Sequence, residues 1–408
     1  MNLQLHIKDI VSKQKITVSG SKSESNRLLI LQKLYPEITI QNLSNSDDSM
    51  HLQHALSTKE KMIDIGHAGT AMRFLTAFFA SQEGKTVILT GSERMQNRPI
   101  KILVDALNSL GADIAYVDKE GYPPLKIIGK KLTKNKVQID GNVSSQYISA
   151  LLLIAANLEN GLSVKLIGKI TSVPYINMTL SLLKQVDIEC SFEDDLITVL
   201  PKKAIKKQTI VVESDWSSAS YYYSMIALSL IGTEITLSAY KKDSLQGDMC
   251  LSEIYEKFGI ETTFNTNSIR LIKTEKQLSK HITLQLQNAP DIAQTIAITC
   301  LGLHISCTLT GLHTLKIKET DRLVALKNEL EKCGGKVRIT DESLHLKPTE
   351  KITKNATIQT YNDHRMAMAF VPLALKNSLI ISDANVVTKS YKNFWKDMQQ
   401  IGFQTTEV

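Results

Sequence analysis

The hydrophobic pattern of this chain repeats one unit, in which an apolar-periodic helix is followed by a glycine or small polar break and then by a strand. In one copy, the periodic run 106–110 ends at Gly111, and a β-rich run follows it. A glycine ends a helix at low cost because it adopts the left-handed conformation without steric strain. Further copies recur about 70 residues apart, with their breaks at Asp187, Gly259, Gly334 and Gly402.

These copies predict about six α/β units in a duplicated domain architecture. Residues 55–66 are interpreted as a degenerate first copy. The short β-rich runs at 87–90, 162–166 and 235–237 lie near turn residues and predict mixed or antiparallel strands. No G-x-G-x-x-G motif follows a strand, so a dinucleotide-binding fold is not supported.

The composition is that of an ordinary globular protein, with 43% hydrophobic and 22% charged residues in 408. No apolar run approaches the ~18 residues that a membrane-spanning helix needs, and the N-terminus lacks the layout of a signal peptide. The five cysteines are scattered and form no C-x-x-C pair, which favours a reducing compartment and argues against a structural zinc. We therefore expect a cytoplasmic protein.

The formal charge of +7 fits either a nucleic-acid partner or a small anionic substrate. Lysines are spread along the whole chain, and few aromatic residues lie among them to stack on bases. The charge alone leaves both interpretations open.

Residues 20–27, Gly-Ser-Lys-Ser-Glu-Ser-Asn-Arg, form the first candidate anion site. A β-branched run precedes this small-residue turn and an apolar-periodic helix follows it. The backbone N–H groups and the positive dipole end of such a helix attract anions, and Lys22 and Arg27 add full charges. The stretch is not a Walker A loop, because Ser21 separates the glycine from the lysine. The alternative is a capped helix with a solvated basic rim.

Other polar clusters also precede apolar helices. Serine, threonine and aspartate at a helix start are what ordinary capping predicts, and the acidic and basic residues of 318–322 are spaced for simple salt bridges along a helix. Arginine near an apolar helix start more often faces a carboxylate or a phosphate. The arginines in such places are Arg27, Arg73, Arg98, Arg322 and Arg365.

Six motifs together resemble the 5-enolpyruvylshikimate-3-phosphate (EPSP) synthase family, in the family's order and over nearly the whole chain. They are Gly20-Ser21-Lys22-Ser23 with Asn26-Arg27, Ala68-Gly69-Thr70-Ala71-Met72-Arg73, Arg98-Pro99-Ile100, Val143-Ser144-Ser145-Gln146, Lys318-Glu319-Thr320-Asp321-Arg322, and Asp363-His364-Arg365-Met366.

The resemblance implies a two-domain, inside-out α/β barrel built from six βαβαββ units, with helices inside and sheets outward. One domain is implied to be continuous over residues 19–213. The other would join residues 1–18 to residues 214–408, and the active site would lie in the cleft between the two domains.

The implied reaction transfers the enolpyruvyl group of phosphoenolpyruvate to the 5-hydroxyl of shikimate-3-phosphate and releases phosphate. It requires a base for the hydroxyl and an acid for the methylene carbon. The resemblance suggests Asp291 and Glu319 as candidates for the base, leaving the choice between them open, and Lys22 as the proton donor. It implies no metal and no organic cofactor, and a monomer without nucleic-acid or membrane partners.

The family's substrate contacts carry over residue by residue. Those implied for shikimate-3-phosphate are Lys22, Ser23, Arg27, Ser144, Ser145, Gln146, Ser172, Tyr175, Asp291, Thr314 and Lys318. Those implied for phosphoenolpyruvate are Lys22, Gly69, Arg98, Gln146, Arg322, Arg365 and Lys389.

The chain departs from the family pattern at three places. His67 stands where asparagine is common, Phe74 where proline often follows the arginine, and Thr314 where an asparagine contact to the sugar ring is frequent. Two other functions remain as alternatives. A UDP-N-acetylglucosamine enolpyruvyl transferase would carry a cysteine on the loop 91–98, which has none. A non-catalytic anion-binding or nucleic-acid-binding protein would not explain why Asp291 and Glu319 accompany the cations.

Overall fold

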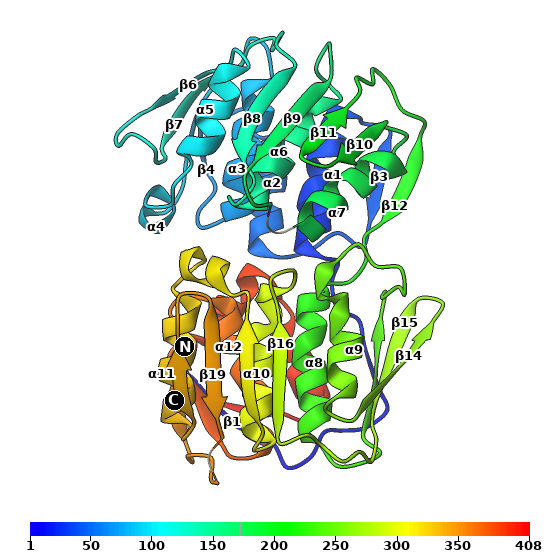
Figure 1. Cartoon of the computed structure of the whole chain (residues 1–408), viewed down its shortest axis with the longest axis vertical. Coiled ribbons are helices and arrows are strands. Elements are labelled where there is room, and N and C mark those ends of the chain that lie inside the picture. The colour runs from blue at the N-terminus through cyan, green and yellow to red at the C-terminus, as the bar shows by residue number, and fades with distance from the viewer. Residues whose placement is uncertain (171–172, 349) are drawn as a thin grey trace. The chain divides into compact units, whose positions relative to one another are not determined.

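The computed structural model describes residues 1–170, 173–348 and 350–408, and the chain divides into two compact units (Figure 1). One unit is Gly20–Val212, and the other joins Met1–Ser19 to Glu213–Val408. In the second unit, the segment that ends at Ser19 and the segment that begins at Glu213 are joined by hydrogen bonds. Ser214 Oγ donates to the carbonyl of Val18 at 2.6 Å, and the amide of Asp215 donates to the carbonyl of Ser19 at 3.3 Å.

Five four-stranded sheets share one topology, which establishes the predicted repeat. In each of these sheets, as the described residues form them, the first two strands are parallel and the last two are antiparallel, and the third strand in space pairs antiparallel with the second. In four of the sheets the last two strands are a hairpin of consecutive strands, and in the fifth they are β1 (Leu3–His6) and β22 (Gln404–Glu407). In spatial order the sheets of Gly20–Val212 are β4 (Met62–Asp64), β5 (Thr86–Thr90), β7 (Leu125–Ile128), β6 (Asp113–Tyr116), and β8 (Lys136–Asp140), β9 (Leu162–Ile167), β11 (Leu196–Val199), β10 (Cys190–Glu193).

The other unit contains three such sheets. They are β2 (Gln14–Ile16), β13 (Glu234–Ser238), β15 (Ser268–Lys273), β14 (Ile260–Asn265); β16 (His281–Gln285), β17 (Ser306–Thr310), β19 (Ser343–Lys347), β18 (Lys336–Ile339); and β20 (Ala356–Ile358), β21 (Leu379–Ile381), β1 (Leu3–His6), β22 (Gln404–Glu407). In the last sheet the N-terminal strand β1 lies between β21 and β22 and pairs antiparallel with both. The two ends of the chain therefore complete one sheet.

The sixth sheet has only two strands among the described residues, β3 (Ile38–Gln41) paired in parallel with β12 (Gln208–Val211). The prediction that residues 55–66 are a degenerate first copy is therefore wrong in detail. Helix α2 (Asp47–Ser57) ends at Thr58 in an extended conformation, and the next strand, β4, opens the following unit. Within the described ranges, the sixth unit has its helices but no hairpin.

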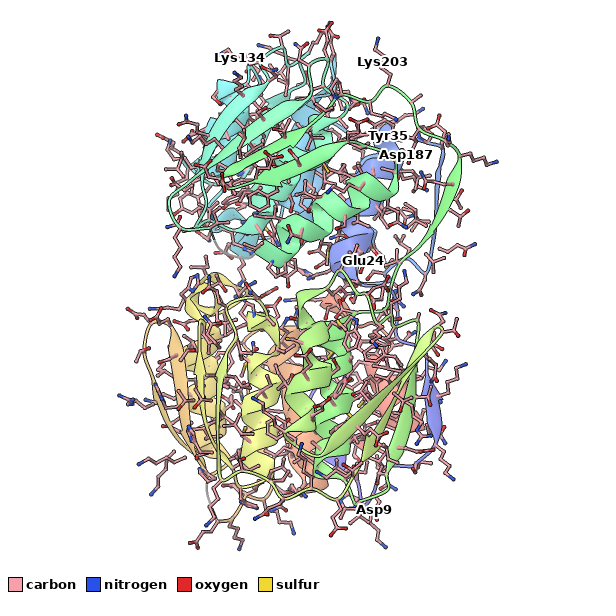
Figure 2. The ribbon with its side chains drawn as sticks, turned by 45° about the vertical axis from the view of Figure 1, so that its right-hand side comes forward. Asp9, Glu24, Tyr35, Lys134, Asp187 and Lys203 are labelled. Atoms are coloured by element: carbon pink, nitrogen blue, oxygen red, sulfur yellow. The ribbon has the colours of Figure 1, made fainter. Side chains whose placement is uncertain are left out.

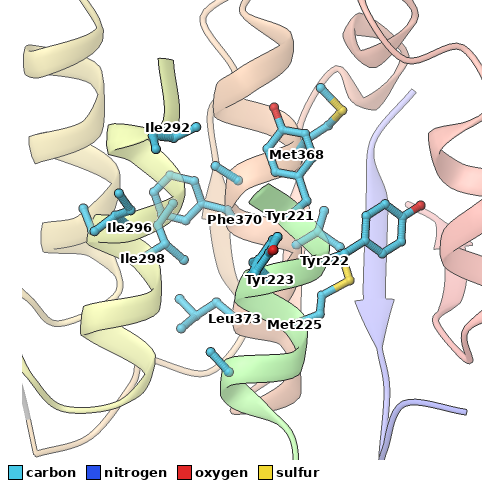
Figure 3. Close-up of a cluster of buried hydrophobic side chains, with 14 of the residues drawn as sticks. Tyr221, Tyr222, Tyr223, Met225, Ile292, Ile296, Ile298, Met368, Phe370 and Leu373 are labelled. Carbon is cyan, nitrogen blue, oxygen red and sulfur yellow. The ribbon is translucent and has the colours of Figure 1, made fainter. Parts of the chain in front are cut away.

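The helices lie inside the sheets, as the predicted inside-out barrel requires. Every residue of α3 (Gly69–Ala80), α8 (Trp216–Leu228) and α10 (Ala293–Gly302) is buried, which is expected of a helix surrounded by other elements. Strands β8 and β16 alternate buried and exposed residues, so one face of each sheet meets solvent. Figure 3 shows the result in the larger unit, where Tyr223, Ile296 and Phe370 belong to one buried cluster.

The described residues also form other, less completely buried helices. They are α1 (Lys22–Leu34), α4 (Glu93–Gln96), α5 (Lys101–Ser109), α6 (Ser145–Ala155), α7 (Val173–Gln185), α9 (Leu251–Glu256), α11 (Arg322–Lys332), α12 (His364–Phe370) and α13 (Phe394–Gln400). Short 3₁₀ helices are η1 (Gly247–Cys250), η2 (Pro290–Ile292), η3 (His313–Ile317), η4 (Val371–Leu375) and η5 (Ala384–Lys389). Helix α4 lies within the stretch that was predicted as a loop.

The breaks that define the sequence repeat adopt the left-handed conformation after their helices, with φ of 104° at Gly111, 59° at Asp187 and 76° at Gly259. Each break turns the chain from a helix into the hairpin. Figure 2 shows Tyr35 and Asp187, which follow α1 and α7, together at the end of the unit away from Glu24. The starts of α1 and α7 therefore share the opposite end. No helix in the described part of the chain combines the length and the hydrophobicity needed to cross a membrane.

Candidate active site

In the larger unit, the candidate site residues gather where several helices begin. Asp291 lies in η2, directly before α10, and three cations from two other elements reach its carboxylate. Arg322 Nη1 contacts Asp291 Oδ1 at 2.8 Å, Lys318 Nζ contacts the same oxygen at 3.5 Å, and Arg365 Nη2 contacts Oδ2 at 3.2 Å. The topology explains this convergence, because each of these helices follows a strand at the same end of its unit.

Arg322 is almost completely buried and is held by three carboxylates. Besides Asp291, it donates from Nε to Asp363 Oδ2 at 2.6 Å and from Nη2 to Glu319 Oε2 at 2.6 Å. Burial would lower the pKa of Arg322, but Asp363, Glu319 and Asp291 raise it above the ordinary value. The contact to Glu319 is the salt bridge that the sequence spacing allowed, whereas the other two come from distant parts of the chain.

The three cations also keep Asp291 ionised. Burial alone would raise the pKa of this carboxyl, but Arg365, Lys318 and Arg322 outweigh burial and hold the pKa well below its usual range. Its side chain is 11% exposed and that of Glu319 is 26% exposed. Both carboxylates therefore remain partly accessible next to buried positive charge.

Arg365 is positioned by the start of its own helix and by α8. Asp363 caps α12 by accepting a hydrogen bond from the amide of Arg365 at 2.8 Å. Arg365 Nη2 also donates to Ser217 Oγ at 3.2 Å, and Ser217 Oγ donates to Asp248 Oδ2. Burial and then the charge of Asp291 raise the pKa of Asp248 to about 7, while Arg365 and the Ser217 hydroxyl oppose the shift.

Two further candidates lie on 3₁₀ helices of the same unit. Lys389 Nζ donates to the carbonyl of Asn362 at 2.7 Å, which attaches η5 to the turn just before α12. Thr314 lies in η3, and its Oγ1 is buried without a hydrogen-bond partner among the described residues.

In the smaller unit, Arg27 connects three helices. It is buried on α1 and donates from Nε to Thr179 Oγ1 of α7 at 2.7 Å and from Nη2 to Ser149 Oγ of α6 at 3.0 Å. It also donates to the carbonyls of Ser23 at 2.7 Å and Tyr175 at 3.3 Å. Burial lowers the pKa of Arg27 to about 10, and the nearby Tyr175 opposes that shift. Most of its donors are engaged within the protein.

Phe74, one of the departures from the family pattern, packs under this arginine. The Arg27 guanidinium lies 5.5 Å from the centre of the buried Phe74 ring, a geometry in which a cation is attracted to the face of an aromatic ring. The departure thus has a structural role in the smaller unit.

Gly69 and Arg98 lie in direct contact. Gly69 is the first residue of α3, and a Cβ atom added to it would overlap Nη1 of Arg98. Arg73, buried one turn later, donates to the carbonyls of Gly69 at 3.0 Å and Pro99 at 3.2 Å. It thereby fixes the chain on both sides of this contact. Tyr147 Oη also donates to the carbonyl of Pro99, at 2.6 Å.

The start of α6 brings together the predicted serine and glutamine residues. Ser144 caps the helix by accepting from the amide of Gln146 at 3.4 Å, and Ser145 is the first helical residue. Gln146 Nε2 donates to Thr70 Oγ1 of α3 at 3.2 Å. Lys22 and Arg98 form no ion pair with a carboxylate within the described ranges, unlike the cations around Asp291. Ser172 lies outside the described residues.

The sequence did not reveal the residues that hold these candidates in place. The motif 363–366 contains Asp363 but gives no sign that its carboxylate binds Arg322, and the motif 68–73 contains Thr70 but gives no sign of its contact with Gln146. Ser149 and Thr179, which hold Arg27, lie inside apolar helices and carry no local signal. The described part of the chain contains no group of three or more histidine, cysteine or acidic residues arranged to hold a metal ion.

Comparison with known proteins gives concordant matches in sequence and in structure. The sequence model of the family described as EPSP synthase (3-phosphoshikimate 1-carboxyvinyltransferase) matches residues 52–398. The chain is 44% identical to the 3-phosphoshikimate 1-carboxyvinyltransferase of Bacteroides fragilis strain YCH46, over 96% of each sequence. It is 36% identical to the protein of that name from Haemophilus influenzae strain PittEE, over 95% of this chain and 96% of the relative.

Solved structures resemble the fold at lower sequence identity. The EPSP synthase of Acinetobacter baumannii superposes with a TM-score of 0.81 at 20% identity, covering 100% of both chains. The enolpyruvyl transferase NikO of Streptomyces tendae gives a TM-score of 0.73 at 11% identity, covering 100% of this chain and 99% of that one. Both likenesses support the two-domain architecture of six related units.

Proposed function

Because this chain belongs to the EPSP synthase family, we propose that its two groups of site residues serve one reaction. That reaction transfers the enolpyruvyl group of phosphoenolpyruvate to the 5-hydroxyl of shikimate-3-phosphate and releases phosphate, a step of the shikimate pathway. The chain is a transferase. The two substrates together carry two phosphates and two carboxylates, so their approach requires compensating positive charge.

The observation that carries this proposal is the convergence of three cations on one carboxylate. Lys318 and Arg322 come from one segment and Arg365 from another, and Asp291 is their common anion. The guanidinium group of arginine can donate two parallel hydrogen bonds to a phosphate or to a carboxylate. We assign Arg322, Arg365 and Lys389 to phosphoenolpyruvate, and Lys318, Thr314 and Asp291 to shikimate-3-phosphate.

Residues of the smaller unit complete the assignment. Lys22, Gly69, Arg98 and Gln146 are assigned to phosphoenolpyruvate. Those assigned to shikimate-3-phosphate are Lys22, Ser23, Arg27, Ser144, Ser145, Gln146, Ser172 and Tyr175. The contact of Arg98 with Gly69 and the absence of a carboxylate partner for Lys22 and Arg98 within the described ranges support their roles as anion-binding cations.

The chemistry proceeds by addition and elimination. The 5-hydroxyl oxygen attacks C2 of phosphoenolpyruvate while a base removes its proton and an acid protonates C3. The C2–O bond to phosphate then breaks, and C3 loses a proton to restore the double bond. We propose Asp291 or Glu319 as the base and Lys22 as the proton donor. The ion pairs keep Asp291 a weak base until substrate anions replace it on Arg322 and Arg365, which raises its proton affinity.

Phosphate release from phosphoenolpyruvate tests the proposal. We expect release that depends on shikimate-3-phosphate, and no release when UDP-N-acetylglucosamine replaces it or when no acceptor is present. The third condition controls for simple hydrolysis. Release that follows UDP-N-acetylglucosamine instead would assign the chain to the sister reaction.

Replacing Gly69 with alanine is expected to weaken phosphoenolpyruvate binding. The added methyl group would displace the Arg98 guanidinium, and losing a charge-assisted hydrogen bond raises KM for phosphoenolpyruvate about tenfold. Because the clash is with the flexible end of a side chain, the fold should persist. Steady-state kinetics of G69A, R98A and the double variant test this. If the losses of phosphoenolpyruvate binding in G69A and R98A simply add in the double variant, the alanine at position 69 does not act through Arg98.

We also propose a cytoplasmic monomer. The five cysteines form no disulfide, which fits a reducing compartment. Fractionation of cells and size-exclusion chromatography with light scattering test the compartment and the oligomeric state.

A further inference from the structure

Arg365 is the start of a hydrogen-bond chain that ends at a buried carboxyl with no part in the proposed reaction. Its Nη2 donates to Ser217 Oγ at 3.2 Å, and Ser217 Oγ donates to Asp248 Oδ2. Ser217 lies in the first turn of α8 and Asp248 lies in η1, and both are buried. These hydrogen bonds therefore connect Arg365 to α8 and η1, whereas Asp291 lies in η2.

We propose that Ser217 and Asp248 are positioning residues that orient the Arg365 guanidinium for phosphoenolpyruvate. The inference deepens the proposed function and rests on it. The Arg365 guanidinium donates from Nη2 to the side chains of Asp291 and Ser217, and from Nη1 to the main-chain carbonyl of Asp291 at 3.4 Å. When an anionic substrate replaces the Asp291 carboxylate as its partner, the Ser217 hydroxyl remains on Nη2 and still holds the plane of the guanidinium. A planar, two-pronged contact depends on that orientation.

The charge state of Asp248 fits this role. The charged groups that face it are Asp291 from η2, Arg365 from α12 and Asp215 from the start of α8, and Cys250 lies near it. Because burial and two carboxylates oppose its ionisation, Asp248 is largely neutral below about pH 7. A neutral carboxyl still accepts from Ser217 without repelling the substrate. As the pH rises through this range, Asp248 ionises, and the new negative charge weakens substrate binding.

The first test is Ser217→Ala. We expect KM for phosphoenolpyruvate to rise about tenfold, because a hydrogen bond to a charged group is lost. The values of kcat and of KM for shikimate-3-phosphate should change little. Ser224→Ala is the matched control, because Ser224 is a buried serine on the same helix that accepts from Thr299 Oγ1 at 2.8 Å. Thermal unfolding of both variants shows whether they are equally folded.

The second test compares Asp248→Asn with Asp248→Ala from about pH 6 to about pH 8.5, which spans the titration range. In the wild type, KM for phosphoenolpyruvate should rise with pH. The asparagine variant retains an acceptor oxygen and cannot ionise, so its KM should match the wild type at low pH and should not show the alkaline rise. The alanine variant should have a raised KM throughout. Titration of the substrates themselves affects all variants equally and cancels in the ratios.

Two results would overturn the inference. One is a KM for phosphoenolpyruvate in S217A no higher than in S224A. The other is an asparagine variant with the same pH profile as the wild type, and this variant remains informative if D248A does not fold. Failure of the proposed function is distinguishable, because the wild type would then release no phosphate in response to shikimate-3-phosphate.

Discussion

Asp291→Asn is expected to lose nearly all activity and much stability. Loss of the proposed base or of its alignment lowers kcat about a thousandfold, within the usual range for general acid–base groups. Arg365 and Lys318 would lose their carboxylate while Arg322 keeps Asp363 and Glu319. Breaking a buried ion pair costs about 3 kcal/mol in the free energy of unfolding. Chemical denaturation and steady-state kinetics measure both effects.

The pH dependence and added anions provide controls for this prediction. Since folding depresses the pKa of Asp291, its ion pairs stabilise the wild type above the ordinary pKa of about 4, and this contribution is lost as the pH falls below it. The stability gap between the wild type and D291N should therefore shrink in acid. Inorganic phosphate should raise the unfolding temperature of D291N more than that of the wild type, because it replaces the missing charge. A constant gap and equal phosphate effects would contradict the ion-pair explanation.

Lys22→Ala is expected to abolish most turnover while the fold survives. Lys22 is the first residue of α1 and is only partly buried. Because it forms no ion pair with a carboxylate in the described part of the chain, its removal should change the unfolding temperature by less than about 2 °C, as for a typical surface substitution. If Lys22 donates the proton to C3, kcat should fall at least a hundredfold.

Lys33→Ala is the matched control for this variant. Lys33 lies in the last turn of the same helix and is exposed, so its loss should leave kcat and both KM values unchanged. An unfolded K22A protein, or K22A with the activity of K33A, would show that Lys22 has been given the wrong role.

The hydrophobic pattern predicted the repeat but not how each sheet is completed. The breaks at Gly111, Asp187 and Gly259 are local signals, and each adopts the left-handed conformation that was expected. The hairpins after these three breaks are formed by consecutive strands, but other strands of the sheets find their partners far along the chain. The N-terminal β1 completes the sheet of β22, and β12 pairs with β3. No local pattern identifies such partners.

The candidate site was also only partly predictable from the sequence. The cations were recognisable because arginine is unexpected at an apolar helix start, and Arg322 and Arg365 indeed contact a common carboxylate. The partners that set their geometry are tertiary. Asp363 has the sequence of an ordinary helix cap and also holds Arg322, and Ser217 resembles any serine at a helix start. Their second contacts exist only after folding.

Mass analysis of shikimate-3-phosphate after incubation with the enzyme and phosphoenolpyruvate tests the central claim most directly. The account predicts that shikimate-3-phosphate gains one enolpyruvyl group for each phosphate released, and that D291N and K22A greatly slow both changes together. Phosphate release without a mass gain in shikimate-3-phosphate, or a mass gain that D291N and K22A leave unaffected, would contradict it.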